Sequence, residues 1–221
     1  MQSNEEMVAY LLEQGYADER VANAMRKIDR AIFVSKEYER YAYADTPLPI
    51  GKDQTISAPG VVAFMSKSLD AREGMKILEV GSGSGYQAAI LAELVGGKGR
   101  VYTVERILEL VMLARSNIAK LGYKNVEFIH GDGTKGYKEK APFDRVIVTA
   151  AAPSIPPPLV EQLVDGGRLL IPVGNKFWQD LQLVERYGKK TKITNIMPVV
   201  FVPLVGEFGH RGDISTLISL I

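Results

Sequence analysis

The chain has 221 residues and no cysteine, which excludes disulfide bridges, thiol catalysis and cysteine-bound metals. Histidine is scarce as well: only His130 and His210 occur. A histidine that ends an apolar run is more often a packed residue than a ligand, so we expect this of His130 and assign no metal site. The same scarcity argues against a Ser-His-Asp triad.

The chain also has no large excess of charge of either sign. Lysine and arginine number 27 and aspartate and glutamate 26, with no basic block, so the sequence predicts no nucleic-acid partner. No apolar run reaches membrane-spanning length and the N-terminus carries no signal pattern, so we predict a cytoplasmic protein without a membrane partner. The hydrophobic fraction of 46% is enough for one α/β domain with a sizeable core.

The most informative stretch is KILEVGSGSGY, residues 76–86. A short apolar run indicates a strand buried on both faces. Glycines follow at alternate positions, Gly81, Gly83 and Gly85, and residues 87–94 are typical of a helix. This order of strand, glycine turn and helix lets main-chain N–H groups approach a nucleotide-like ligand, although a glycine run by itself also fits a plain tight turn.

The spacing of the glycines narrows the class of ligand. A dinucleotide fingerprint requires a third glycine where Tyr86 stands, so a nicotinamide oxidoreductase is disfavoured. The run G-x-G-x-G preceded by Glu-Val instead resembles motif I of the class I S-adenosylmethionine-dependent methyltransferases.

Strand and helix patterns alternate along the rest of the chain. Expected helices cover residues 4–14, 19–28, 59–69, 87–94, 107–121 and 156–164, and expected strands cover 76–80, 100–104, 126–130, 143–150, 168–174, 181–187 and 199–204. The last two strands are expected to be antiparallel, at the sheet edge. The sequence thus predicts a doubly wound, mostly parallel seven-stranded α/β sheet of Rossmann-like form, with an N-terminal helical extension.

Acidic residues fall at the carboxyl ends of three consecutive strands: Glu79, Glu105 and Asp132. Glu105 follows the glycine run at the distance expected of a carboxylate that accepts both ribose hydroxyls. Asp132 is placed to accept from an adenine amino group, beside the main-chain N–H of Gly133. A single such acid fits a helix cap or a solvated loop equally well, but three in register behind the glycine turn favour a ligand site.

Upstream and downstream segments resemble one methyltransferase family. LPIGKDQTISAP (residues 48–59), GDG (131–133), AAAP (150–153), GGRLLIPVG (166–174) and VPL (202–204) are all similar to the protein-L-isoaspartate O-methyltransferases. The resemblance runs from the N-terminal helices to about residue 204. It departs at Asp53, where many members have glycine, and at Val205, where threonine is frequent.

The resemblance implies site residues by position. Ser57 matches the active-site serine, although a serine two residues before a proline also fits a helix cap. The positions that the resemblance assigns to the cofactor are Thr55, Ile56, Glu79, Gly81, Gly83, Gly85, Glu105, Asp132 and Gly133. The resemblance further implies one methyltransferase domain over residues 1–221, with helices and the active-site loop in 1–58.

The implied reaction moves a methyl group from S-adenosyl-L-methionine to the free α-carboxylate of an L-isoaspartyl residue in a damaged protein or peptide, leaving S-adenosyl-L-homocysteine. A carboxyl with a pKa of about 3.3–3.9 is ionised at neutral pH, so no general base is required. Ser57 is then a hydrogen-bond donor that orients the acceptor. The ester closes to a succinimide, whose hydrolysis returns some normal aspartate.

Two other functions remain open from the residues themselves. The same scaffold serves methyltransferases of nucleic acids or small metabolites, and a non-catalytic module could retain the cofactor as a structural ligand. The apolar tail within residues 206–221 is a candidate contact for a homo-oligomer, or it docks on its own domain.

Overall fold

The computed structural model describes residues 1–175 and 177–211. The helices are α1 (Asn4–Glu13), α2 (Glu19–Lys27), α3 (Pro59–Leu69), α4 (Tyr86–Val95), α5 (Leu108–Lys120) and α6 (Pro157–Glu161). The strands are β1 (Leu48–Gly51), β2 (Gln54–Ile56), β3 (Lys76–Val80), β4 (Arg100–Glu105), β5 (Val126–His130), β6 (Phe143–Val148), β7 (Leu163–Gly174), β8 (Gln179–Tyr187) and β9 (Lys190–Val199). The apolar tail predicted as an oligomer contact falls largely in residues 212–221, outside the described residues.

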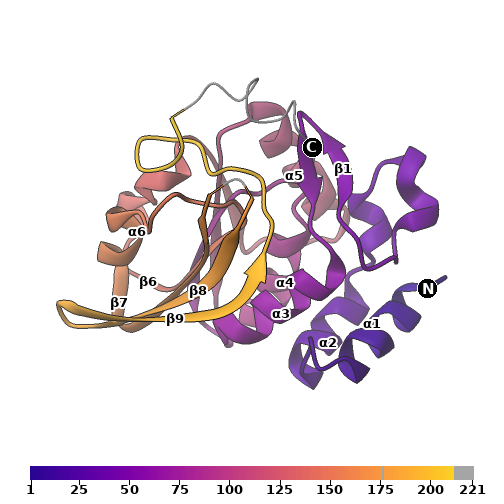
Figure 1. Ribbon diagram of the computed structural model, residues 1–221. Coiled ribbons are helices and arrows are strands. Elements are labelled where there is room, and N and C mark those ends of the chain that lie inside the picture. Colours follow the sequence, from indigo (N-terminus) through magenta and orange to yellow (C-terminus); the bar gives the residue numbers. More distant parts are fainter. Residues whose placement is uncertain (176, 212–221) are drawn as a thin grey trace.

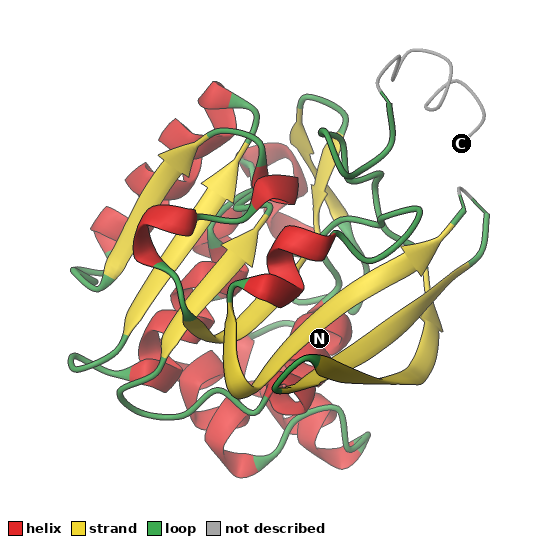
Figure 2. Ribbon diagram, turned by 90° about the vertical axis from the view of Figure 1, so that its left-hand side faces the viewer, coloured by secondary structure: helices red, strands yellow, loops and turns green. Residues whose placement is uncertain are grey.

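A seven-stranded sheet forms the centre, in the order β5-β4-β3-β6-β7-β8-β9. The pairs from β5 to β7 are parallel, and β8 and β9 are antiparallel additions. Figure 2 shows the parallel strands pointing the same way, with helices in front of and behind them. The predicted doubly wound, mostly parallel fold is confirmed. Because the strand order reverses between β3 and β6, a ligand crevice is expected at their carboxyl ends.

Two predicted elements near the C-terminus are wrong. Residues 199–204 do not form the last strand: β9 ends at Val199, and the N–H of Leu204 donates to the Ala151 carbonyl at 2.8 Å instead. β9 is an edge strand with mostly exposed side chains, so pairing with β8 defines it rather than an apolar run. The helix predicted to reach Val164 ends at Glu161, because β7 begins at Leu163 beside β6.

The irregular segment between α2 and α3 contains a hairpin that the sequence pattern did not predict. β1 and β2 pair antiparallel, and Lys52 and Asp53 both have positive φ, +56° and +55°. Left-handed backbone at both central positions is the geometry of a type I′ turn, in which aspartate is tolerated and glycine favoured. Asp53 therefore occupies a position where glycine would carry no conformational cost, and the hairpin delivers residues 54–57 to the sheet.

The N-terminal extension begins with two capped helices, as predicted. Ser3 Oγ accepts from the N–H of Glu6 at 3.2 Å, and Asp18 accepts from Val21 at 2.9 Å. Figure 1 shows α1 and α2 together at one side of the molecule, where they pack on α3 and α4. The extension thus supports the two helices that flank the glycine turn.

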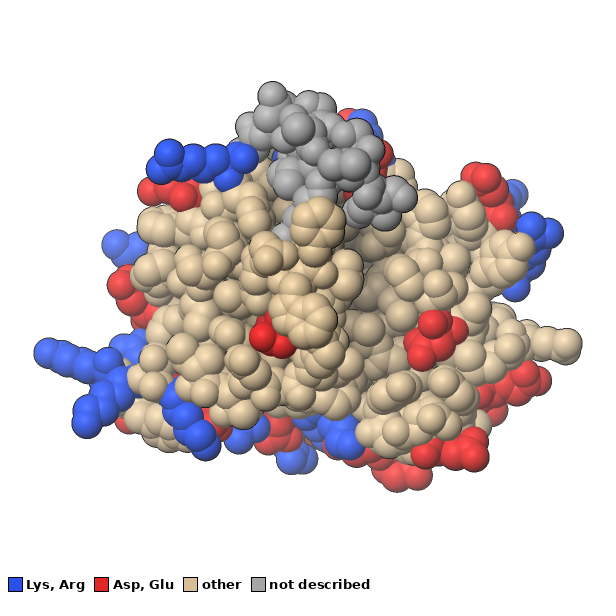
Figure 3. All heavy atoms as spheres, viewed as in Figure 1, with Lys and Arg blue, Asp and Glu red and all other residues tan. Residues whose placement is uncertain are grey.

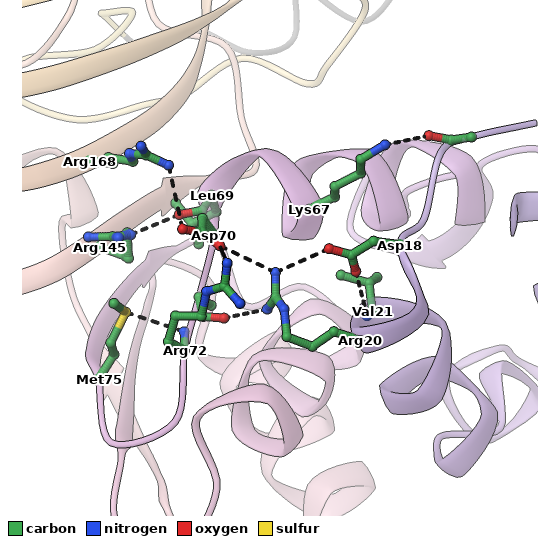
Figure 4. A network of polar contacts seen from close by, with 12 residues as sticks. Asp18, Arg20, Val21, Lys67, Leu69, Asp70, Arg72, Met75, Arg145 and Arg168 are labelled. Atoms are coloured by element: carbon green, nitrogen blue, oxygen red, sulfur yellow. Dashed lines mark hydrogen bonds and ion pairs between the residues drawn. The ribbon is translucent and has the colours of Figure 1, made fainter.

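Polar contacts tie the end of α3 to its neighbours (Figure 4). Asp70, which ends the helix at φ +54°, pairs with Arg20 of α2 and Arg168 of β7. Arg145 of β6 donates to the carbonyl of Leu69 at 2.8 Å. Cations are favourable at a helix C-terminus, and these side chains come from both the extension and the sheet. The position of α3 is therefore set by elements on both sides.

Charged side chains of both signs are mixed on the face drawn in Figure 3, and lysine and arginine lie mainly at its rim. Of the helices within residues 1–175 and 177–211, none combines the length and the apolarity that crossing a membrane requires. In the same residues, no group of three or more histidine, aspartate or glutamate side chains has an arrangement suited to a metal ion.

Candidate active site

An open cavity of about 860 Å³ lies at the carboxyl ends of β3, β4 and β6, where the strand order reverses. Three chain segments form half of its wall: residues 54–57 after the hairpin, residues 81–84 of the glycine turn, and residues 202–205 near the C-terminus.

The glycine turn exposes main chain to this cavity. Gly81 has φ +97°, and a Cβ there would lie 2.3 Å from Thr149 Oγ1. A Cβ on Gly133 would lie 2.5 Å from Val80 Cγ1. Gly83 is also left-handed, at φ +51°. At positions 81 and 133 only glycine fits without displacing a neighbour, so the main chain there is not covered by a side chain and a ligand can approach it.

The third glycine of the run has a different environment. Gly85 is the N-cap of α4 with φ +91°, and a Cβ there would lie 3.2 Å from three atoms of Ala114 in α5. Its small size allows α4 and α5 to pack closely. Gly85 is not among the residues that line the cavity, whereas the adjacent Tyr86 is.

Glu105, at the end of β4, lines the cavity and binds two main-chain N–H groups beside it. One carboxylate oxygen accepts from the N–H of Gly83 at 3.2 Å and the other from Ile107 at 3.0 Å. The side chain is 7% exposed. Each oxygen retains capacity for a further donor, so this carboxylate can accept hydrogen bonds from two neighbouring hydroxyls of a ligand.

Glu79 lies fully buried behind the turn and does not line the cavity. Its Oε2 accepts from Thr103, whose hydroxyl lies 2.7 Å from the hydroxyl of the cavity residue Ser82. Its Oε1 has no partner among the described residues. Burial raises the pKa of Glu79 from 4.5 to about 8, against the Thr103 hydrogen bond, with Glu105 adding to the rise.

The raised pKa of Glu79 predicts a dependence of stability on pH. The unfolded chain releases this proton near pH 4.5 and the folded protein retains it to about pH 8, so raising the pH through this window favours unfolding. We expect Glu79→Gln, which cannot ionise, to gain stability relative to the wild type progressively across the window. Urea unfolding at a series of pH values measures this difference.

The control is Glu13→Gln, at an exposed position that ends α1. Its unfolding free energy should follow that of the wild type at every pH. A difference between Glu79→Gln and the wild type that stays constant over the window would contradict the assignment.

Asp132 lies beside the cavity rather than on its wall. Oδ1 accepts from the N–H and the hydroxyl of Thr134 at 2.9 and 2.6 Å, and Oδ2 accepts from Glu207 at 2.9 Å. These bonds hold its pKa below the usual value despite partial burial. A Cβ on Gly206 would lie 2.1 Å from Oδ1, so the segment after Leu204 runs tightly against this carboxylate.

Ser57 lines the cavity and does not cap α3. The N-cap is Ala58, without a side-chain cap, and the N–H of Gly60 is instead bound by Asp45 Oδ1 at 2.7 Å. The alternative assignment of Ser57 as a helix cap is therefore not what the structure shows. Because Asp45 satisfies the helix N-terminus, the Ser57 hydroxyl remains available to the cavity.

The structure brings together seven of the ten predicted site residues. Those on the cavity wall are Thr55, Ile56, Ser57, Gly81, Gly83, Glu105 and Gly133, while Glu79, Gly85 and Asp132 lie behind it. The sequence interpretation assigned no role to several other wall residues, including Gln54, Ser82, Thr149 and residues 202–205. Thr149 directly follows β6, so the rule that ligands lie at strand ends could have identified it.

The strand order, the bare glycine turn and the acidic strand ends define a Rossmann-like methyltransferase fold. The profile of the family described as Protein-L-isoaspartate(D-aspartate) O-methyltransferase (PCMT) matches residues 2–209. The chain belongs to this enzyme family.

Relatives and a solved structure agree with this assignment. A protein-L-isoaspartate O-methyltransferase of Methanothrix thermoacetophila is 54% identical over 90% of this chain and 93% of its own length. One from Methanoculleus marisnigri is 50% identical over 96% of this chain and 95% of its own. A Plasmodium falciparum beta-aspartate methyltransferase (PCMT), solved with S-adenosyl-L-homocysteine, superposes with a TM-score of 0.84 at 28% identity, covering 93% of this chain and 99% of the other.

Proposed function

We propose that the protein is a repair enzyme that methylates the free α-carboxylate of L-isoaspartyl residues in damaged proteins and peptides. The observation that carries the proposal is the meeting of two segments far apart in the sequence. The glycine turn and the hydroxyl-bearing segment 54–57 line one cavity, so a cofactor and an acceptor can be held face to face.

The cavity residues fit S-adenosyl-L-methionine. When bound, this cofactor supplies a methyl group on a sulfonium, from which the acceptor oxygen displaces it. Main-chain atoms of Gly81, Gly83 and Gly133 line the cavity, where the cofactor can contact them, and Glu105 accepts hydrogen bonds from the ribose hydroxyls. Oδ2 of Asp132 accepts one described donor and has capacity for an adenine amino group.

The chain's own groups beneath the turn suit a cationic ligand. The unpartnered Oε1 of Glu79 lies buried near Glu105, and Thr103 links the other oxygen to Ser82 on the cavity wall. The Glu105 carboxylate, at low exposure, favours positive charge in front of it, and a cation there would lower the raised pKa of the protonated Glu79. This is the electrostatic requirement of a sulfonium or an ammonium group.

The acceptor needs positioning rather than activation. Its carboxyl has a pKa of about 3.3–3.9 and is ionised at neutral pH. The Ser57 hydroxyl donates to one carboxylate oxygen and directs the other toward the methyl carbon, with Thr55 and Ile56 beside it at the cofactor. Holding reacting groups in line contributes up to about 7–11 kcal/mol in well-oriented systems. The neighbouring peptide nitrogen of the substrate then attacks the ester carbonyl and displaces methanol, which closes the succinimide without a group from this chain.

A pair of synthetic peptides tests the proposal. We expect an L-isoaspartyl peptide to accept a labelled methyl group while its normal aspartyl twin does not, because only the former presents a free α-carboxylate beside a longer main chain. Equal labelling of the two peptides, or methyl incorporation into RNA in preference to either, would reject it. Cofactor binding with no turnover on any acceptor would favour a non-catalytic module.

A further inference from the structure

Arg30 is a fully buried cation behind the acceptor side of the cavity. It begins the 3-10 helix Arg30–Phe33, and its side chain is 0% exposed. Its guanidinium donates to the main-chain carbonyls of Ala42, Thr46 and Ser57, the last two at 3.1 Å. The two terminal nitrogens thus donate to three points of the chain rather than to a carboxylate, and Nε has no partner among the described residues.

The charge of this side chain is retained in the interior. Burial lowers the pKa of Arg30 to about 10, with Tyr86 and Asp45 opposing the fall, so the group is still a cation at neutral pH. A buried charge is a poor source of stability, since an apolar side chain of similar volume often serves as well or better. The planar guanidinium group of arginine has another property: it can bind several carbonyls at once in a fixed geometry.

The contact with Ser57 acts on the position of its hydroxyl. The Ser57 carbonyl is held by Arg30, and three residues later the N–H of Gly60 is held by Asp45 at 2.7 Å. Ala42, Asp45 and Thr46 belong to one short loop, which binds Gly60 directly through Asp45 and is linked to Ser57 through Arg30. Ser57 therefore faces the cavity from a segment fixed at two points outside it.

The helix that carries Arg30 also touches the cofactor side. Phe33 packs on Tyr86 with ring centroids 5.2 Å apart, and Tyr86 lines the cavity at the start of α4. The 3-10 helix thus contacts both the acceptor segment and the helix behind the glycine turn. A shift of Arg30 would change the distance between these two parts of the site.

We propose that Arg30 is a positioning residue for methyl transfer, which sets the place of Ser57 relative to the glycine turn through the three carbonyls. It acts through Ser57 and touches neither cofactor nor acceptor. The proposal rests on the proposed function for its kinetic part only.

The kinetic test uses Arg30→Lys and Arg30→Ala with the isoaspartyl peptide. We expect kcat to fall at least about 10-fold in both, because small displacements of a positioning group cost large factors in rate. The Kd for S-adenosyl-L-homocysteine, measured by calorimetry, should stay within about 3-fold, since uniform loss of binding is not expected from an acceptor-side change. Added guanidinium ion should restore part of the kcat of Arg30→Ala and none of that of Arg30→Lys.

The matched control is Arg40→Ala, an exposed arginine of the same N-terminal region that lies over the Tyr41 ring. Its kcat and Kd should equal those of the wild type. An unchanged kcat in both Arg30 variants, or equal losses of kcat, Kd and melting temperature without guanidinium rescue, would overturn the proposal. Loss of folding in both would assign Arg30 to fold stability and overturn it as well.

Hydrogen exchange separates this proposal from the proposed function. In Arg30→Lys, the amides of residues 55–58 and of Gly60 should exchange at least about 10-fold faster while those of β3 keep their protection, because local openings are independent of the sheet core. Unchanged exchange at these amides would refute the positioning role. If the wild type methylates neither peptide, the proposed function fails, and the exchange result still decides whether Arg30 positions Ser57.

Discussion

Gly81→Ala is expected to lose measurable cofactor binding and to be less stable by roughly 2–6 kcal/mol. A non-glycine residue held in sparsely populated backbone geometry costs about 1–3 kcal/mol, and overpacking costs a further 1–3. Here the backbone has φ +97° and the new Cβ would lie 2.3 Å from Thr149 Oγ1. Calorimetry with S-adenosyl-L-homocysteine and urea unfolding measure the two effects.

The matched control is Gly97→Ala. Gly97 has no positive φ, and a Cβ there meets nothing within 4 Å. This variant should bind and unfold as the wild type does, within about 0.5 kcal/mol, as surface substitutions do. Gly81→Ala with wild-type affinity would show that the turn does not hold the cofactor.

Ser57→Ala is expected to lower kcat roughly 10- to 100-fold on the isoaspartyl peptide, because a hydrogen bond to a charged group contributes about 1.5–3 kcal/mol. The Kd for S-adenosyl-L-homocysteine should change less than about 3-fold, since the hydroxyl is assigned to the acceptor rather than to the cofactor. Steady-state methyl transfer and calorimetry on the same preparation give both numbers.

Ser35→Ala serves as the control for this change. Ser35 is exposed, and its hydroxyl makes no cap hydrogen bond although it precedes the 3-10 helix Lys36–Tyr41. Its kinetics should be those of the wild type. A Ser57→Ala protein with normal kcat, or one that loses cofactor affinity as much as rate, would remove Ser57 from the acceptor side.

The glycine turn was predictable because its pattern is local. A buried strand, glycines at alternate positions and a helix within about twenty residues specify one supersecondary unit, and parallel strands bring their carboxyl ends to a common edge. Glu105 could be placed beside this unit for the same reason, and it does contact the N–H of Gly83. The resemblance of residues 54–57 to one family supplied what spacing did not, since Ser57 fits a helix cap equally well by sequence.

Prediction failed where the determining contact is distant in the chain. β9 is specified by pairing with β8 rather than by burial of its own side chains, so no apolar run marks it. The surroundings of Asp132 were not predicted for the same reason: its oxygens accept from Thr134 and Glu207, while its contact with the cofactor stays a prediction. Glu207 is 75 residues away in sequence, and no sequence pattern around it predicts that its amide donates to Asp132.

The amino-acid sequence by itself determined the alternation of helices with the strands β3 to β7, the presence of the glycine turn and the absence of cysteine chemistry. Each of these depends on residue types and on neighbours close in the chain. Tertiary structure decided which polar groups face the cavity. Asp45 binds the start of α3 and leaves Ser57 free, and Arg30 holds the Ser57 carbonyl from 27 residues away. These hydrogen bonds depend on which donor reaches which acceptor in the folded chain, and a local sequence pattern does not predict such distant pairs.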